Sequence, residues 1–180
     1  MKTPVKSFNG YLLRPVEKLF LSTNGENFIK DWEGFEPFPY EDIAGHCTIG
    51  YGEKLHDGKC TVGDHAKYPN GMSHADASQA LSSSVAESVR NVRKWLKGSM
   101  VSQAMFDALV SLTFNTGGNR GQWQVYKLTA TGKFREAAVE FLNINLAENP
   151  NTGKKEPSPG LTKRRQAENN MYLNAVYSKP

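Results

Sequence analysis

The apolar pattern of this 180-residue chain changes twice, and these changes restrict the fold more than any other feature. Apolar residues recur at helical spacing before Gly34 and again from Ser73 onward. Over residues 35–72 this periodicity disappears, and residues 48–52, Thr-Ile-Gly-Tyr-Gly, are typical of a short strand that enters a turn. The pattern predicts an α+β fold that is mainly helical: a helix, a small β-hairpin lobe at about 35–72, and a larger helical lobe at about 73–178. A cleft between the lobes is the expected ligand site.

Helix starts are marked by capping residues. Thr23 and Glu26 have capping-box spacing before a helix that should end at Gly34, and Ser73 and Asp76 have the same spacing before a long helix. Further helices are expected from about 102 to 117, over 122–130, over 133–147 and from about 161 to 176, with a loop at 149–160.

Residues 1–21 form a lead-in that we expect to be an N-terminal extension of the main domain at 22–180. Its apolar residues at 12, 16, 19 and 20 have helical spacing, and Pro15 suits a first helical turn, so a short helix is expected. Pro4, Asn9 and Gly10 interrupt the apolar residues, so no secretory signal peptide is recognised. We therefore expect synthesis in the cytoplasm of the host cell.

Composition and charge limit the possible partners. The chain is 38% hydrophobic and 22% charged, which is typical of a globular protein, and no apolar run reaches the ~18 residues that span a bilayer. Stable membrane insertion is therefore not expected. The formal net charge of +4 favours a polyanionic partner, such as a bacterial wall, a nucleic acid or an anionic membrane surface, without choosing among them.

Two carboxylates and a hydroxyl form the candidate catalytic set. Asp42 follows Glu33 by nine positions, and Thr48 follows Asp42 by six. The helix end and the neighbouring aromatic residues at 32 and 35 disfavour a charged Glu33, whereas Asp42 lies in a polar, Gly-rich loop that suits an ionised carboxylate. A protonated acid opposite an ionised carboxylate is what glycosidic cleavage requires. From the spacing alone, solvated surface charges or caps are the more common explanation for such residues.

Three motifs resemble the phage-type lysozymes of glycoside hydrolase family 24. The first is Glu33-Gly34, then Tyr40-Glu41-Asp42, then residues 45–52, Gly-His-Cys-Thr-Ile-Gly-Tyr-Gly. Two weaker matches are residues 103–117, which resemble the family's central helix, and residues 160–168, Gly-Leu-Thr-Lys-Arg-Arg-Gln-Ala-Glu. The resemblance as a whole spans about 22–172. The family usually has His after the Tyr-Gly pair, where this chain has Glu53.

The resemblance implies a lysozyme-like fold and a muramidase without metal or cofactor. Such an enzyme hydrolyses the β-1,4 bond between N-acetylmuramic acid and N-acetylglucosamine in peptidoglycan, with inversion, and lyses bacteria. It implies that Glu33 protonates the leaving oxygen, while Asp42 with Thr48 directs a water molecule. The two carboxyl groups should then lie about 6.5–9.5 Å apart. A monomer that acts on the wall in the periplasm or extracellular space is expected, as a phage endolysin or as a delivered antibacterial effector.

Further residues carry weaker predictions. Phe114, Asn115 and Lys54 are candidates for substrate binding, although core packing, helix capping and a solvated charge are the respective alternatives. Cys47 and Cys60 could form a disulfide worth about 3 kcal/mol, or remain two reduced thiols. The histidines, at 46, 56, 65 and 74, have spacings that fit no zinc-ligand pair, so no metal site is expected.

Other functions remain open at this point. A lytic transglycosylase would use a Glu without a water molecule, and a non-catalytic module would bind peptidoglycan without cutting it. The basic run at 163–165, Lys-Arg-Arg, also raises a nucleic-acid binder, but no helix-turn-helix, RNA-binding or zinc signature accompanies it. The Asp-Thr pair argues against the transglycosylase, and the complete catalytic set argues against the binding module.

Overall fold

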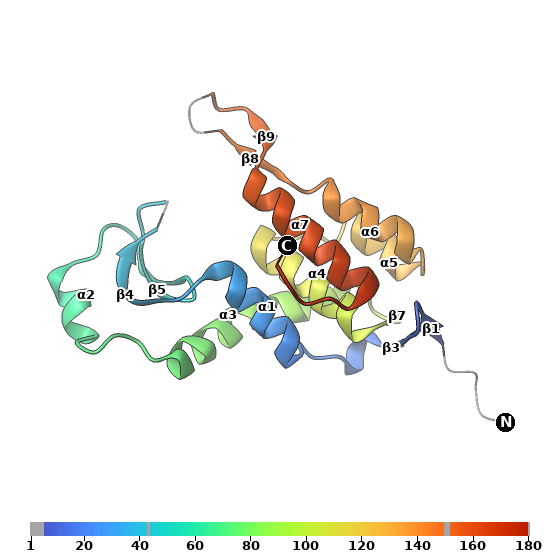
Figure 1. The fold of residues 1–180 in the computed structure, drawn as a ribbon, viewed down its shortest axis with the longest axis horizontal. Coiled ribbons are helices and arrows are strands. Elements are labelled where there is room, and N and C mark those ends of the chain that lie inside the picture. Colours follow the sequence, from blue (N-terminus) through green and yellow to red (C-terminus); the bar gives the residue numbers. More distant parts are fainter. Residues whose placement is uncertain (1–5, 43, 150–151, 180) are drawn as a thin grey trace. The chain divides into compact units, whose positions relative to one another are not determined.

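The computed structural model describes residues 6–42, 44–149 and 152–179 (Figure 1). Two units make up the chain. One comprises Ile29–Glu87, which we call the β unit, and the other comprises Met1–Phe28 with Ser88–Pro180, which we call the helical unit. Helices α1 (Thr23–Glu33) and α3 (His74–Trp95) each contribute residues to both. The predicted α+β class, with a small sheet and predominant helix, is confirmed.

The β unit contains a three-stranded antiparallel sheet. β5 (Cys47–Gly50) lies between β4 (Glu36–Glu41) and β6 (Glu53–His56), and the short helix α2 (Val62–Lys67) follows. Thr48 lies opposite Tyr40 on one neighbour and opposite Lys54 on the other. This register places the middle of the sequence motif at the centre of the sheet.

Close packing inside the β unit explains one glycine of the motif. Gly50 has φ +67°, and a Cβ atom there would lie 3.0 Å from the Met72 sulfur and 3.1 Å from the Ala77 Cβ. Since L-residues rarely adopt this conformation, and the neighbouring atoms leave no room, only glycine fits. The end of β5 can therefore approach α3 closely. The side chains of Ile49 on β5 and Leu81 on α3 are both buried.

The helical unit is centred on α4 (Gln103–Thr116). Ser102 caps its start, and residues 104–113 are all buried, because the helix is apolar on nearly every side. α4 packs beside α7 (Pro159–Asn174), α7 also contacts α6 (Phe134–Leu142), and α6 contacts α5 (Gln124–Ala130). The described residues of this unit also form three strand pairs: β1 (Ser7–Phe8) with β2 (Tyr11–Leu12) near the start of the chain, β3 (Arg14–Pro15) with β7 (Met100–Val101), and β8 (Leu146–Glu148) with β9 (Lys155–Pro157).

The prediction of a helix near the start of the chain is wrong. The structure has a β-hairpin of β1 (Ser7–Phe8) and β2 (Tyr11–Leu12), then β3, and only a three-residue 3-10 helix, η1 (Val16–Lys18). Asn9 and Gly10 form the turn with φ values of +50° and +83°. Asn-Gly is a strong signal for a two-residue hairpin turn, and it overrides the helical spacing of the apolar residues.

Three further predictions need correction: one helix end, one loop and one missed helix. The helix expected to reach residue 147 ends at Leu142, and β8 and β9 form strands where a helix end and a loop were expected. Within residues 35–72, α2 was missed, although Thr61 and Asp64 form a complete capping box at its start. The other predicted helices are confirmed. The division at residues 21 and 22 remains a prediction. Among the described residues, no helix has the length and apolarity needed to cross a membrane.

Candidate active site

Glu33 occupies the last position of α1. The next residue, Gly34, has φ +75°, and its N–H donates to the Lys30 carbonyl at 3.0 Å, which ends the helix. The Glu33 side chain is half-buried, and β4 begins three residues later. The sequence thus places one carboxyl group where a helix passes into the sheet of the β unit.

Asp42 is held by the turn between β4 and β5. Its Oδ1 accepts the His46 N–H at 2.8 Å, and its own N–H donates to the His46 carbonyl at 2.9 Å. The His46 N–H contributes most to lowering the pKa of the Asp42 carboxyl below its ordinary value; the charge of His46 and the Thr48 hydroxyl act in the same direction. The turn therefore favours an ionised Asp42.

Thr48 lies on β5, next to this carboxylate. Its hydroxyl is 3.4 Å from Asp42 Oδ2 and 3.3 Å from the His46 carbonyl, so the single proton is shared between two acceptors. Thr48 is 2% exposed, whereas Asp42 is half-buried. The hydroxyl can therefore orient the carboxylate from the protein side, and solvent reaches the carboxylate.

Comparison with known proteins identifies the family. A family model described as phage lysozyme matches residues 30–168, which is most of the chain and includes Glu33, Asp42 and Thr48. The chain belongs to the phage lysozyme family. It is therefore a glycoside hydrolase of the lysozyme type, which hydrolyses peptidoglycan, and the assignment made from the three motifs is confirmed.

Individual relatives agree with this assignment. The endolysin of Acyrthosiphon pisum secondary endosymbiont phage 1 is 30% identical over 158 residues, which cover 87% of this chain and 100% of the relative. Among solved structures, the endolysin from Escherichia coli O157:H7 phage FAHEc1 has a TM-score of 0.78 and 35% identity, covering 90% of this chain and 98% of the other. The muramidase domain of SpmX from Asticaccaulis excentricus has a TM-score of 0.72 and 28% identity, over 87% and 99% of the two chains.

Lys54 of this phage lysozyme is paired within its own unit. Its Nζ donates to Asp57 Oδ1 at 2.8 Å, and this bond raises the pKa of the Lys54 ammonium. Lys54 lies opposite Thr48 on β6 and is exposed, so it remains accessible to a substrate. Substrate binding by Lys54 stays a prediction.

Phe114 and Asn115 lie in the last turn of α4, in the helical unit of the lysozyme. Both side chains are half-buried. The Asn115 side-chain oxygen accepts a hydrogen bond from the Arg165 guanidinium of α7. The structure thus gives Asn115 a structural contact, and its proposed contact with substrate, like that of Phe114, stays a prediction.

A buried ionic cluster joins α7 to α4 beside Asn115. Glu168 is fully buried and accepts the Ser111 hydroxyl at 2.7 Å, while Arg164 and Arg165 lie 3.3 and 3.2 Å from its two oxygens. Burial raises the pKa of the Glu168 carboxyl despite these partners. The Gly-Leu-Thr-Lys-Arg-Arg motif thus contributes a charge network to the lysozyme core. Arg164 and Glu168 have the i,i+4 spacing of a helical ion pair, but this spacing does not indicate that the pair is buried.

Glu53, where the family usually has His, also has a defined contact in this lysozyme. Its Oε2 accepts the Ser84 hydroxyl of α3 at 3.1 Å. The residue therefore links β6 to α3 within the β unit by a hydrogen bond. The possible disulfide is also confirmed: Cys47 and Cys60 are joined, with an S–S distance of 2.05 Å. It ties β5 to the segment that precedes α2.

Proposed function

We propose that this lysozyme hydrolyses the β-1,4 bond between N-acetylmuramic acid and N-acetylglucosamine with inversion, and that Glu33 and Asp42 divide the acid and base roles. The observation that supports this most strongly is the setting of Asp42, whose carboxylate accepts the His46 N–H and lies beside the Thr48 hydroxyl. Both groups favour the charged form that a general base needs.

The proposed reaction moves two protons. Glu33, in the last turn of α1 at the negative end of the helix dipole, gives its proton to the glycosidic oxygen as the bond to the anomeric carbon breaks. Asp42 accepts a proton from a water molecule whose oxygen bonds to the opposite face of that carbon. Thr48 holds Asp42 Oδ2 in position for this step. No metal or cofactor has a role in the proposal.

Substrate contacts and setting complete the proposal. Lys54, Phe114 and Asn115 contact the glycan, and the enzyme acts as a monomer on the cell wall, in the periplasm or extracellular space. The phage endolysin is the preferred biological role, since named endolysins are among the relatives of similar length.

Loss of wall turbidity measures the roles of the three residues. Glu33→Gln and Asp42→Asn keep the size of each side chain but remove the acid or the base, so each should lower the rate by about 10²–10⁴-fold. Glu36→Gln and Glu41→Gln are matched controls, because both exposed carboxylates flank the site on β4, and they should retain activity within about twofold.

Two outcomes would overturn the proposal. Equal activity of Glu33→Gln and Glu36→Gln, with unchanged melting temperatures, would remove Glu33 from the reaction. Anhydro-muramic ends on the released fragments, in place of free reducing ends, would show that no water takes part, and would favour the transglycosylase.

A further inference from the structure

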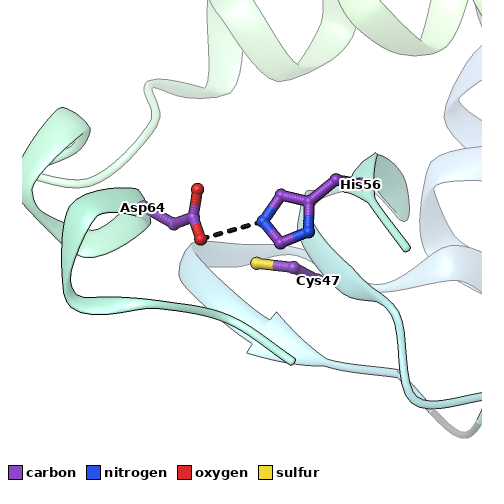
Figure 2. A group of neighbouring side chains, drawn as sticks. All are labelled: Cys47, His56 and Asp64. Atoms are coloured by element: carbon purple, nitrogen blue, oxygen red, sulfur yellow. Dashed lines mark hydrogen bonds and ion pairs between the residues drawn. The ribbon is translucent and has the colours of Figure 1, made fainter. Parts of the chain in front are cut away.

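Three potential metal ligands lie close together in the β unit (Figure 2). Cys47 Sγ, a ring nitrogen of His56 and a carboxylate oxygen of Asp64 all lie within 4.8 Å of one another. Cys60, bonded to Cys47, brings a second sulfur to the same place. Cys47 and Asp64 are buried, and His56 is half-buried. While the disulfide is intact, neither sulfur is a thiolate, and the group cannot hold a metal through them.

The imidazole of His56 is oriented as a metal ligand usually is. Its Nε2 faces Asp64 Oδ2 at 2.9 Å, and its Nδ1 lies 3.0 Å from the Asp57 carbonyl oxygen. Because the carbonyl and the carboxylate both accept, the ring donates from both nitrogens while the disulfide is closed. Loss of the Nε2 proton would keep the Nδ1–H bond to the carbonyl and leave the Nε2 lone pair available to a metal. A histidine that binds a metal through one nitrogen commonly donates its other N–H to a carbonyl or carboxylate.

Asp64 is supported in the same way. Its Oδ2 accepts the Thr61 N–H at 2.9 Å and the Thr61 hydroxyl at 2.7 Å, as part of the capping box of α2. Carboxylates that bind metals are typically held by such hydrogen bonds. The non-sulfur half of a four-ligand site is therefore already oriented while the disulfide is closed.

We infer that reduction of the disulfide converts this group into a zinc site with Cys47, Cys60, His56 and Asp64 as ligands. A dithiol reductant supplies two electrons and two protons, breaks the S–S bond to give two thiols, and itself becomes a disulfide. One Zn²⁺ then binds, and the two thiols and the Nε2–H group of His56 release their protons. Two thiolates, one carboxylate and a neutral imidazole make a tetrahedral set that suits Zn²⁺.

The required movements are small. Bonds of about 2.0–2.3 Å to a tetrahedral zinc place neighbouring ligand atoms about 3.3–3.8 Å apart. The Nε2–Oδ2 pair must therefore widen by about half an ångström from 2.9 Å, and the sulfurs must separate after reduction. The three residues that define the group lie on β5, β6 and α2. Zinc and the disulfide thus cross-link the same region in alternative redox states, and oxidation expels the metal.

The test titrates the purified full chain with Zn²⁺ in its oxidised state and after reduction by a phosphine under anaerobic conditions. The reduced chain should bind one Zn²⁺, by calorimetry, at least about 100-fold more tightly than the oxidised chain. Co²⁺ in place of Zn²⁺ should show a thiolate-to-cobalt charge-transfer band and the visible bands of tetrahedral Co²⁺. These readouts do not depend on enzymatic activity.

Variants separate a four-ligand site from adventitious thiol binding. His56→Gln should weaken Zn²⁺ binding by roughly tenfold or more, whereas His65→Gln, an exposed histidine on α2 outside the group, should bind as the wild type does. The inference is overturned if reduced wild type binds Zn²⁺ no more tightly than the Cys47→Ser/Cys60→Ser double variant. It is equally overturned if His56→Gln and Asp64→Asn both bind as the wild type does.

A measurement on the wild type covers the case in which these variants do not fold. The ¹⁵N resonance of His56 Nε2 in the reduced chain should shift on addition of one equivalent of Zn²⁺, while that of His65 stays constant. A His56 resonance that does not respond would overturn the inference.

Discussion

Individual hydrogen bonds stabilise the ionised form of Asp42. The bond from the Thr48 hydroxyl can be removed by a substitution that keeps the size of the side chain. The His46 N–H and the Thr48 hydroxyl both lower the pKa of Asp42. Thr48→Val removes the hydroxyl but keeps the branched shape. We expect the pKa of Asp42 to rise, and the rate at neutral pH to fall about 10–100-fold, because a hydrogen bond to a charged group is lost.

A pH profile of wall lysis checks this expectation. If ionised Asp42 is the base, activity rises with pH through the pKa of Asp42, so the acidic limb of the Thr48→Val profile should lie at higher pH than in the wild type. Thr152→Val, an exposed threonine of the helical unit, is the control and should leave the limb in place. An acidic limb that is unchanged in Thr48→Val would contradict the role given to Thr48.

Individual site residues differ in how far the sequence reveals them. Glu33, Asp42 and Thr48 could be named because their spacing follows a local motif, and the helix end and the turn that hold them are also local. The setting of Glu168 could not be named, since its burial depends on Ser111, 57 positions away on another helix. The proposed Zn²⁺ ligands are hidden for the same reason: histidine spacing carries no information about a fold that brings His56 within 2.9 Å of Asp64.

At the scale of elements, the start of α1 is fastened to α4 through one buried carboxylate. Asp107 accepts the Ser22 N–H and hydroxyl, the Gln103 amide and the Tyr177 hydroxyl. Gly25 approaches it so closely that a Cβ atom there would lie 2.7 Å from Asp107 Cγ. Four donors thus converge on the single side chain that positions the start of α1.

Two Asp107 variants should behave differently. Asp107→Ala leaves the donors without an acceptor and should cost about 2–4 kcal/mol of unfolding free energy. Asp107→Asn can still accept the two N–H donors and donate to the two hydroxyls, so it should cost less than about 1 kcal/mol near neutral pH. Urea unfolding of both variants measures the difference, and equal losses would contradict this account of the cluster.

The same carboxyl should make stability depend on pH. Burial raises the pKa of Asp107, so the folded chain holds this proton more tightly than the unfolded chain does. Its contribution to stability is therefore complete below the unfolded pKa, and is lost as pH rises through the folded pKa. The stability of wild type should therefore decline as pH rises through the folded pKa of Asp107. The melting temperature of Asp107→Asn should not show this part of the decline. A wild-type curve that parallels the variant across the acidic range would show that Asp107 does not titrate as described.

Most of the helices that the sequence predicts were found from signals within a few residues of their ends. Capping signals act within one turn of helix, and Ser73 correctly located the start of α3. The predicted cap of α1, Thr23, is one residue late, because the Ser22 hydroxyl accepts the Gly25 N–H at 3.0 Å. The Asn9-Gly10 turn and the Thr61–Asp64 capping box are equally local and could have located β1, β2 and α2. The pairing of β3 with β7 joins residues more than 80 positions apart, and no local pattern indicates it.

At the scale of the whole molecule, residues 6–21 pack as part of the helical unit. Arg14 and Pro15 pair with β7, and Val16 and Leu19 are buried. Leu19 is 2% exposed and Leu12, from the same segment, is 44% exposed, so the two leucines form a matched pair. Leu19→Ala should lower the free energy of unfolding by about 2–4 kcal/mol, and Leu12→Ala by less than about 1 kcal/mol. Denaturant unfolding measures both losses. If both variants lose less than about 1 kcal/mol, residues 6–21 would instead be an extension that contributes little to the stability of the helical unit.

The stereochemistry of the first product tests the central claim most directly. A soluble wall glycan is cleaved by wild-type enzyme inside the NMR spectrometer, and the new reducing end is observed before its anomers equilibrate. Because the bond that breaks is β, water directed by Asp42 to the opposite face should release the α anomer first. A β anomer as the first product would contradict the account, since Asp42 would then have to act as a nucleophile.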